Sequence, residues 1–432
     1  MGERPGHARS SGKRHATRRA GSRGRDARPC AEQRSLYAPS RPHATRPVER
    51  HTSGGPWIVT STTGWRPRLR DLGITIGALP AGPLNAITDV VGVRVGHATV
   101  IHGEGALLAG EGPARTGVTA IHPHEGSTFA SMVPAAIEVL NGAGEMTGRS
   151  QVDEYGLLES PILITNTLSV GAVHRAVVDW LCREEPALGT QHFVIPVVAE
   201  TFDGWLNDIA GQHITAEHTW AALDGATTGP VAEGNVGGGT GMRLFGHKGG
   251  IGTASRIVSI DGGSYTVGVL VQGNFGVLGD LLVDGVPVGR ELHTAPQARD
   301  EGKDGSVIVV IATDAPLSDR QLGRLCRRGM LGLSRSGGVG RNSSGDILIA
   351  FSNDAANRVD RSASDAVRTV RQLADPWIDE LFVATIEATE EAVLNALVAA
   401  ETMTGRDGNT AVAFPHDRLL EIMERHGRVR RA

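Results

Sequence analysis

The chain has 432 residues, of which 40% are apolar and 4% aromatic, so it can form one large α/β body or two to three domains. Its formal net charge of -4 and its scarcity of aromatics argue against a nucleic-acid-stacking surface, and no apolar run approaches the length that spans a membrane. The three cysteines, Cys30, Cys182 and Cys326, have no CxxC spacing, which excludes a zinc knuckle and favours a reducing, cytoplasmic location.

The start of the chain differs in composition from the rest. Residues 1–56 carry 13 Lys and Arg against 4 Asp and Glu, with few apolar residues. Such a segment buries too little surface to offset its conformational entropy. An Arg-rich start also resembles a transit peptide or a nucleic-acid arm, but it lacks their other features. We therefore predict a disordered Arg-rich extension over residues 1–64 and a single domain over residues 65–432.

Short apolar runs and turn signals alternate from residue 68 onward. They predict strands at residues 91–95, 161–165, 193–198, 256–260, 265–272, 307–313 and 347–351. Helices are expected at residues 134–140, 170–182 and 389–404, the last capped by Thr389 and stopped by Gly405. Several of the strands are apolar throughout, which indicates a sheet covered on both faces and a layered α/β fold.

A glycine cluster and a histidine pair resemble ligand-binding motifs. The glycines of residues 234–241 lack the GKS or GKT ending of a phosphate loop and do not fit GxGxxG, so they predict a turn where backbones approach closely. His122-Pro123-His124 has no third ligand at a recognisable spacing. It predicts a pair of surface histidines, and no metal site is expected.

The sequence Asp304-Gly305-Ser306 stands at the mouth of the apolar run 307–313, after a polar stretch over residues 290–304. Ser306 is either a serine buried at the start of a strand or the point where the chain cuts itself. No G-x-S-x-G elbow is present. A serine freed at an N-terminus would carry its own base, because an α-amine has a pKa of about 7.7–8.0.

Three other sites in the sequence are each consistent with either a catalytic or a purely structural role. Asn274 ends an apolar strand in a glycine-flanked turn, where it is either an oxyanion donor or a turn residue. Ser344 and Asp346 form either a proton relay beside a terminal amine or a simple cap. Glu200, at a strand end, either pairs with a substrate amine or is solvated.

Ordered motifs from about residue 68 to 410 resemble the DmpA-type aminopeptidases. This family contains the L-aminopeptidase/D-esterases and the β-peptidyl aminopeptidases, which are self-processing N-terminal-serine hydrolases. The motifs are Leu72-Gly73-Ile74, residues 82–90 and 92–97, Asn141-Gly142-Ala143-Gly144-Glu145-Met146-Thr147-Gly148, residues 200–205 and 250–256, Gln272-Gly273-Asn274, Asp304-Gly305-Ser306 and residues 312–317.

The resemblance implies cleavage between Gly305 and Ser306 and a nucleophile at Ser306. It implies an oxyanion donor at Asn274 and a substrate-amine partner at Glu200. Ser344 and Asp346 fall where the family has a serine and an acidic residue, usually Glu, beside the terminal amine. Phe202 falls in the substrate site, where the family's prototype has Tyr.

For the fold, the resemblance implies a four-layer αββα sandwich, like that of DmpA and ornithine acetyltransferase and similar to the Ntn hydrolases. It also implies a homo-oligomer and no cofactor. We expect a self-processing serine aminopeptidase or amidase that releases N-terminal residues from short peptides, amides or esters. The alternatives are an uncleaved, weakly active or inactive binding and assembly protein, or an acyltransferase of the ornithine acetyltransferase type. The latter use threonine at the cut, so Ser306 disfavours them.

Overall fold

The computed structural model describes residues 66–292 and 305–430. These residues belong to one compact unit. The predicted extension over residues 1–64 and most of the polar stretch before Ser306 lie outside the described residues, so both stay predictions. None of the described helices is both long and apolar enough to cross a membrane.

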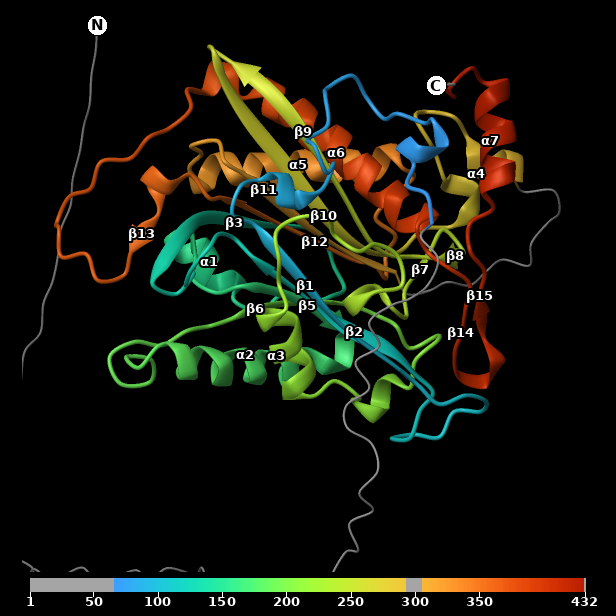
Figure 1. Cartoon of the computed structure of the whole chain (residues 1–432), viewed down its shortest axis with the longest axis horizontal. Helices are drawn as coiled ribbons and strands as arrows, with labels where there is room; N and C mark the ends of the chain where they lie inside the picture. Colours follow the sequence, from blue (N-terminus) through green and yellow to red (C-terminus); the bar gives the residue numbers. More distant parts are fainter. Residues whose placement is uncertain (1–65, 293–304, 431–432) are drawn as a thin grey trace, which may run out of the picture. The chain divides into compact units, whose positions relative to one another are not determined.

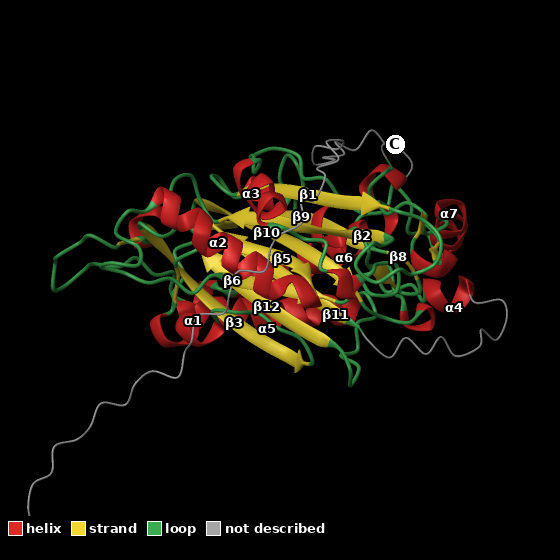
Figure 2. Cartoon of the chain, turned by 90° about the horizontal axis from the view of Figure 1, so that it is seen from below, coloured by secondary structure: helices red, strands yellow, loops and turns green. Residues whose placement is uncertain are grey.

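The described chain forms four layers (Figure 1). Helices α5 (Asp319–Arg335) and α6 (Asp379–Val398) lie at the top, helices α2 (Val170–Glu184) and α3 (Ala216–Asp224) lie at the bottom, and two sheets lie between them. Figure 2, seen from below, shows α2 and α3 in front of the strands. This is the αββα sandwich that the family resemblance implied.

The larger sheet has seven strands in the order β13-β3-β12-β11-β10-β9, with β4 beside β3, and the smaller has four in the order β1-β2-β5-β6. Their bounds are β1 Arg94–His102, β2 Ala114–His122, β3 Ser131–Gly142, β4 Leu157–Leu158, β5 Ile162–Asn166, β6 Val197–Thr201, β9 Gly250–Ile260, β10 Gly263–Asn274, β11 Ser306–Thr313, β12 Gly345–Ser352 and β13 Val359–Asp360. The remaining elements are the pairs β7 (Arg243–Leu244) with β8 (His247–Lys248) and β14 (Met403–Thr404) with β15 (Thr410–Ala411), and the helices α1 (Arg149–Tyr155), α4 (Val288–Leu292) and α7 (His416–Arg425).

Strand β11, predicted from its continuous apolar run, lies at the centre of the fold. All eight of its residues are buried, because side chains of alternating direction enter two different cores. Val307 and Val309 pack with α5 and α6, whereas Ile308 and Val310 pack between the two sheets. A third core lies between the smaller sheet and α2 and α3.

Local signals account for two of the connections. Asp261 and Gly262 both adopt positive φ, at 47° and 77°, which joins β9 to β10 by a two-residue hairpin turn of the type that Asp-Gly favours. Helix α5 begins after Ser318, whose side chain accepts a hydrogen bond from the backbone of Gln321.

The glycine cluster 234–241 is a close-approach segment, as predicted. A Cβ at Gly238 would lie 2.1 Å from Gln272 Oε1, and one at Gly241 would lie 2.2 Å from the carbonyl oxygen of Arg115. Any larger residue at these positions would displace a neighbouring element.

Several local predictions were wrong. Residues 134–140 belong to β3, because Ala135 and Ile137 face the core between the sheets and tertiary packing overrides the helical propensity of this stretch. The pair His122 and His124 is buried, not exposed, and both rings donate to backbone carbonyl oxygens, which compensates for the loss of water.

Helix α6 runs over Asp379–Val398, so Thr389 is a buried mid-helix residue and Gly405 lies beyond the end. Every residue from 387 to 398 of this helix is buried, against β9, β10 and α5, so this part of the helix lacks the polar face that marks an amphipathic helix. The strand expected at residues 193–198 lies instead at Val197–Thr201, and strand β2 was missed.

Candidate active site

Three adjacent strands bring the predicted residues together. Asn274 is opposite Ser306 in the antiparallel pairing of β10 with β11. Ser306 is opposite Gly345 in the parallel pairing of β11 with β12. Because Ser344 and Asp346 flank Gly345, the register alone gathers four residues that are far apart in the sequence.

Ser306 is the first residue of β11 and is buried. Its Oγ accepts a hydrogen bond from the backbone N–H of Phe202 at 3.3 Å. The backbone N–H of Gly345 donates to the carbonyl oxygen of Gly305 at 3.0 Å. That carbonyl belongs to the predicted scissile bond, and a donor on its oxygen makes its carbon more electrophilic.

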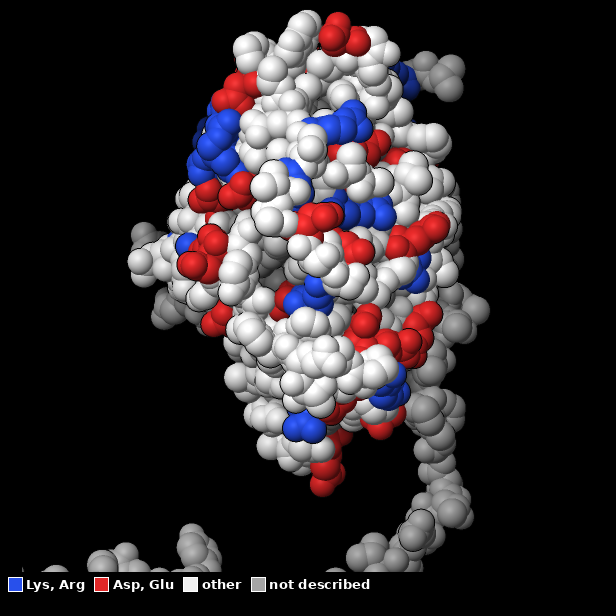
Figure 3. All heavy atoms as spheres, turned by 90° about the vertical axis from the view of Figure 1, so that its left-hand side faces the viewer, with Lys and Arg blue, Asp and Glu red and all other residues white. Residues whose placement is uncertain are grey.

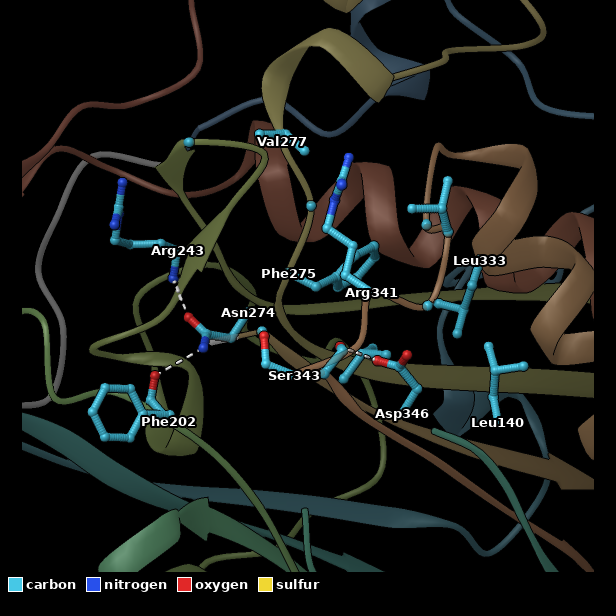
Figure 4. A pocket seen from close by; sticks show the side chains of 18 of the residues that line it. Leu140, Phe202, Arg243, Asn274, Phe275, Val277, Leu333, Arg341, Ser343 and Asp346 are labelled. Carbon is cyan, nitrogen blue, oxygen red and sulfur yellow. Dashed lines mark hydrogen bonds between the residues drawn. The ribbon is translucent and has the colours of Figure 1, made fainter. Parts of the chain in front are cut away.

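The Asn274 amide is fixed from both ends (Figure 4). Its Oδ1 accepts from the backbone N–H of Arg243 at 2.9 Å, and its Nδ2 donates to the backbone oxygen of Phe202 at 2.8 Å. An amide nitrogen has two hydrogens, so the arrangement leaves one donor to offer to a negatively charged oxygen near Ser306.

Ser344 and Asp346 form a buried pair next to the scissile bond. Ser344 Oγ donates to Asp346 Oδ1 at 2.6 Å, and a Cβ added to Gly305 would lie 3.4 Å from Ser344 Oγ. Burial raises the pKa of Asp346, and the hydrogen bond from Ser344 opposes that shift. A carboxyl of this kind exchanges protons nearer neutral pH than an ordinary Asp.

A cavity of about 320 Å³ opens beside these residues. Gly305 and Val307 line it on either side of Ser306, and Asn274, Ser344 and Asp346 also line it. Figure 4 shows its labelled lining residues, with Asn274 pointing towards Arg243 and Phe202. The remaining walls are apolar and cationic, made of Leu140, Trp205, Phe275, Val277, Leu333, Val339 and Arg341.

Of the two predicted substrate-binding residues, Phe202 lines the cavity and Glu200 does not. Phe202 lines the cavity and its side chain is 38% exposed. Glu200 is only 3% exposed and is not among the cavity's lining residues. Its carboxylate accepts from the backbone N–H of Glu145 at 3.0 Å and from the hydroxyl of Thr167, and burial raises its pKa.

Glu200 is nevertheless close to the site. A Cβ at Gly144 would lie 3.0 Å from Glu200 Oε1 and 3.1 Å from the Cα of Gly345. Glycine at position 144 therefore allows the strand that carries Glu200 to approach the strand that follows Ser344. Glu200 sits one layer behind the lining of the cavity.

Sequence analysis missed three residues of the site. Trp205 and Arg243 line the cavity, and the Arg243 guanidinium stacks 4.0 Å from the centre of the Trp205 ring. Lys248 is fully buried just behind Arg243. The one signal for Arg243 was its position directly after the glycine cluster. Within the described residues, no group of three or more His, Cys, Asp or Glu side chains is arranged to hold a metal.

Comparison with known proteins agrees with this geometry. A model of peptidase family S58 matches residues 85–411. The chain is 48% identical to the beta-peptidyl aminopeptidase BapA of Sphingosinicella microcystinivorans over 377 residues, which cover 84% of this chain and 93% of the relative.

Two solved structures resemble the chain closely. A Burkholderia sp. beta-aminopeptidase superposes with a TM-score of 0.76 at 46% identity, covering 83% of this chain and 99% of its own. The L-aminopeptidase D-Ala-esterase/amidase of Ochrobactrum anthropi superposes with a TM-score of 0.78 at 44% identity, covering 84% and 100%. The latter is described as a prototype of the serine aminopeptidases and a new variant among the Ntn hydrolase fold.

Fold and site therefore define a hydrolase built on a variant of the Ntn hydrolase fold. The chain belongs to peptidase family S58, the family of the DmpA-type aminopeptidases. The family resemblance, the αββα fold and the assignment to the aminopeptidase class of enzymes are confirmed. The roles of individual site residues stay predictions.

Proposed function

We propose that the chain cuts itself between Gly305 and Ser306 and then works as a serine aminopeptidase or amidase on short peptides, amides or esters. The observation that carries this proposal is the arrangement at the strand mouth. Ser306 Oγ, the Gly305 carbonyl held by Gly345 N–H, and the Ser344–Asp346 pair all meet there. In self-cleavage the Ser306 hydroxyl attacks the Gly305 carbonyl carbon, the C–N bond breaks as the serine nitrogen takes the hydroxyl proton, and Gly305 is left as an ester on Ser306 Oγ. Water then hydrolyses this ester, which gives Gly305 a carboxyl end and leaves Ser306 with a free hydroxyl and a free α-amine.

The mature site would run on the same groups. The new α-amine of Ser306 takes the proton of its own hydroxyl, and the oxygen attacks the substrate carbonyl. Asn274 Nδ2 stabilises the oxyanion, and the leaving amine recovers the proton. Water then releases the acyl group from Ser306. Ser344 and Asp346 hold the α-amine in place, and no step calls for a cofactor.

The environment of Ser306 favours this reading over the two alternatives. The Gly345 N–H to Gly305 bond is the first rung of the β11–β12 ladder and suits any strand start. A merely structural serine would not, however, need a buried serine–carboxyl pair on one side and an amide held at both ends on the other. An acyltransferase of the ornithine acetyltransferase type has threonine at the cut. A homo-oligomeric state, suggested by the resemblance, and a cytoplasmic location, suggested by unpaired Cys182 and Cys326, remain part of the proposal.

Charges of both signs are mixed over the surface of the protein in Figure 3. Lys and Arg are interspersed with Asp and Glu over the face seen in Figure 3, with no uniform basic area in that view.

The purified wild-type protein should consist of two chains that part after Gly305. The second should comprise residues 306–432, a fragment of 127 residues, and should begin with a free serine amine. Intact-mass measurement together with N-terminal sequencing detects both properties. A single 45.3 kDa species that persists for days at neutral pH would exclude the mechanism.

Glu200→Gln should lower kcat/KM for substrates with a free amine by at least about 30-fold. Removing one partner of a buried charge pair costs about 2 kcal/mol or more. Blocking the substrate amine by acetylation should have a similar effect on the wild type and little further effect on the variant. Glu154→Gln is the matched control, because that side chain is exposed and is not among the groups that act on Glu200.

The role proposed for Glu200 also predicts how kcat/KM changes at low pH. Burial raises the pKa of Glu200, so the carboxylate that would bind an ammonium group is lost, as pH falls, earlier than for an ordinary Glu. The acid limb of kcat/KM should therefore move in Glu200→Gln. Equal turnover of free and acetylated substrates by the wild type would refute the assigned role.

A further inference from the structure

A lysine ammonium is buried behind the cavity without a carboxylate partner. Lys248, on β8, is 0% exposed. Its three hydrogens point to three backbone carbonyl oxygens, those of Gly239 at 3.2 Å, Met242 at 2.9 Å and Gly249 at 2.6 Å. In the described part of the chain, no Asp or Glu lies within ion-pair distance of Lys248.

Such a site is costly to maintain. Taking an ammonium group out of water is unfavourable unless its hydrogen bonds and charge are fully compensated. The three carbonyls satisfy its donors, but they do not neutralise its charge, and burial lowers the pKa of Lys248 to about 7. An apolar side chain would hold this turn at a lower cost, so the charge calls for an explanation.

The explanation lies in one peptide group. The carbonyl of the Met242–Arg243 peptide accepts from Lys248, and the N–H of that same peptide donates to Asn274 Oδ1 at 2.9 Å. In a trans peptide the C=O and the N–H point in opposite directions. A continuous line of hydrogen bonds therefore runs from the buried ammonium, across the peptide, to the amide of Asn274. Figure 4 shows its last step, from Arg243 to Asn274.

Two consequences follow for Asn274. The Arg243 N–H holds the oxygen end of the amide, so the nitrogen end must face Phe202 and the mouth of β11. The protonated form of Lys248 places a positive charge on the carbonyl side of the peptide and polarises its N–H, and linked hydrogen bonds strengthen one another in this way inside a protein. Both effects make Asn274 Nδ2 a better donor to a developing oxyanion.

We propose that Lys248 is a positioning residue for catalysis, whose buried ammonium orients and polarises the Asn274 amide through the Met242–Arg243 peptide. The inference rests on the oxyanion role of Asn274 in the proposed function. Lys248 does not touch the substrate. It acts through the backbone of the turn that joins the glycine cluster to β7 and through the Asn274 side chain.

The test is a double-mutant cycle on the processed enzyme, with rates normalised to the fraction of two-chain protein seen by intact mass. Lys248→Met should lower kcat by at least about tenfold and leave KM within about twofold, because the interaction matters most in the transition state. Asn274→Ala should lower kcat by about 10²–10³-fold. In the Asn274→Ala background, Lys248→Met should have almost no further effect.

Arg115→Met is the matched control. The Arg115 side chain is likewise buried and bound to backbone carbonyls, those of Thr404, His102, Ala114 and Gly103, and it makes no hydrogen bond to the residues of the site. It should change the thermal midpoint but not kcat below that midpoint. Lys248→Gln, which keeps a donor but no charge, replaces Lys248→Met if the latter fails to fold.

The outcomes separate the two claims. Equal effects of Lys248→Met with and without Asn274 would overturn the positioning role, since a merely structural lysine acts independently of that amide. The same conclusion follows if both Lys248 variants fold but are never processed. If Asn274→Ala itself keeps full kcat, the oxyanion assignment fails instead, and the Lys248 inference falls with it for a different and recognisable reason.

Discussion

The Ser306→Ala variant should purify as one uncut chain and lose peptidase activity by about 10⁴–10⁶-fold, the scale seen when an enzyme's nucleophile is removed. The substitution deletes the hydroxyl that accepts the Phe202 N–H and that attacks both the Gly305 carbonyl and the substrate. It also prevents release of the α-amine that serves as the base. Intact mass and turnover of an amino-acid amide measure the two losses together.

A matched control exists in the same sheet. Ser264 also follows a glycine near the start of a strand, β10, but it is exposed and has no serine–carboxyl pair beside it. Ser264→Ala should be cut after Gly305 and should turn over substrate at the wild-type rate.

Loss of activity in Ser306→Ala has one other source, namely that the uncut chain blocks the cavity. Ser306→Cys separates the two explanations, because a thiol can replace the hydroxyl in both steps. This variant should be cut, retain part of the activity and become sensitive to a thiol-alkylating reagent. Activity in Ser306→Ala, or alkylation without effect in a cut Ser306→Cys, would move the nucleophile elsewhere.

The residue pattern predicted a layered α/β fold, and the family resemblance supplied its four layers. Residues 307–313 are apolar in every position but the last, and a short run of β-branched residues with that pattern indicates a strand covered on both faces. The same logic placed β10 and β12 to within a few residues. It failed at residues 134–140, where alanine and leucine favour a helix locally and the decisive partners, β12 and α5, are about 200 residues away.

Some residues of the candidate site could be predicted from the sequence, and others could not. Ser306, Asn274, Ser344 and Asp346 were named from residue type and resemblance, and the strand register then brought them together. Lys248 was not accessible to sequence analysis, because its partners are three backbone carbonyls and a carbonyl has no residue identity. Sequence analysis left Glu200 as either a partner of a substrate amine or a solvated residue, and the structure shows that it is buried. This burial could not be predicted, because it depends on Gly144, whose missing side chain lets two strands approach.

Arg256→Met should lower the free energy of unfolding by about 3–5 kcal/mol, the cost of breaking a buried ion pair by removing one partner. Arg256 is fully buried and binds Glu387 at 3.0 Å and Glu391 at 2.7 Å, which ties β9 to α6. Methionine fills much of the volume but leaves the two carboxylates with fewer donors. Urea unfolding followed by circular dichroism measures the change, and an unchanged slope would show that the unfolded state is the same.

Two further variants locate the cause in the charges. Arg175→Met removes one partner of the exposed Arg175–Asp179 pair and should cost no more than about 0.5 kcal/mol. Glu391 keeps its ion pair with Arg70 in this variant, whereas Glu387 loses the arginine that binds it. Adding Glu387→Gln to Arg256→Met neutralises the carboxylate left without an arginine and should recover part of the loss. If the double variant is less stable than Arg256→Met alone, then the unpaired charge of Glu387 does not account for the effect.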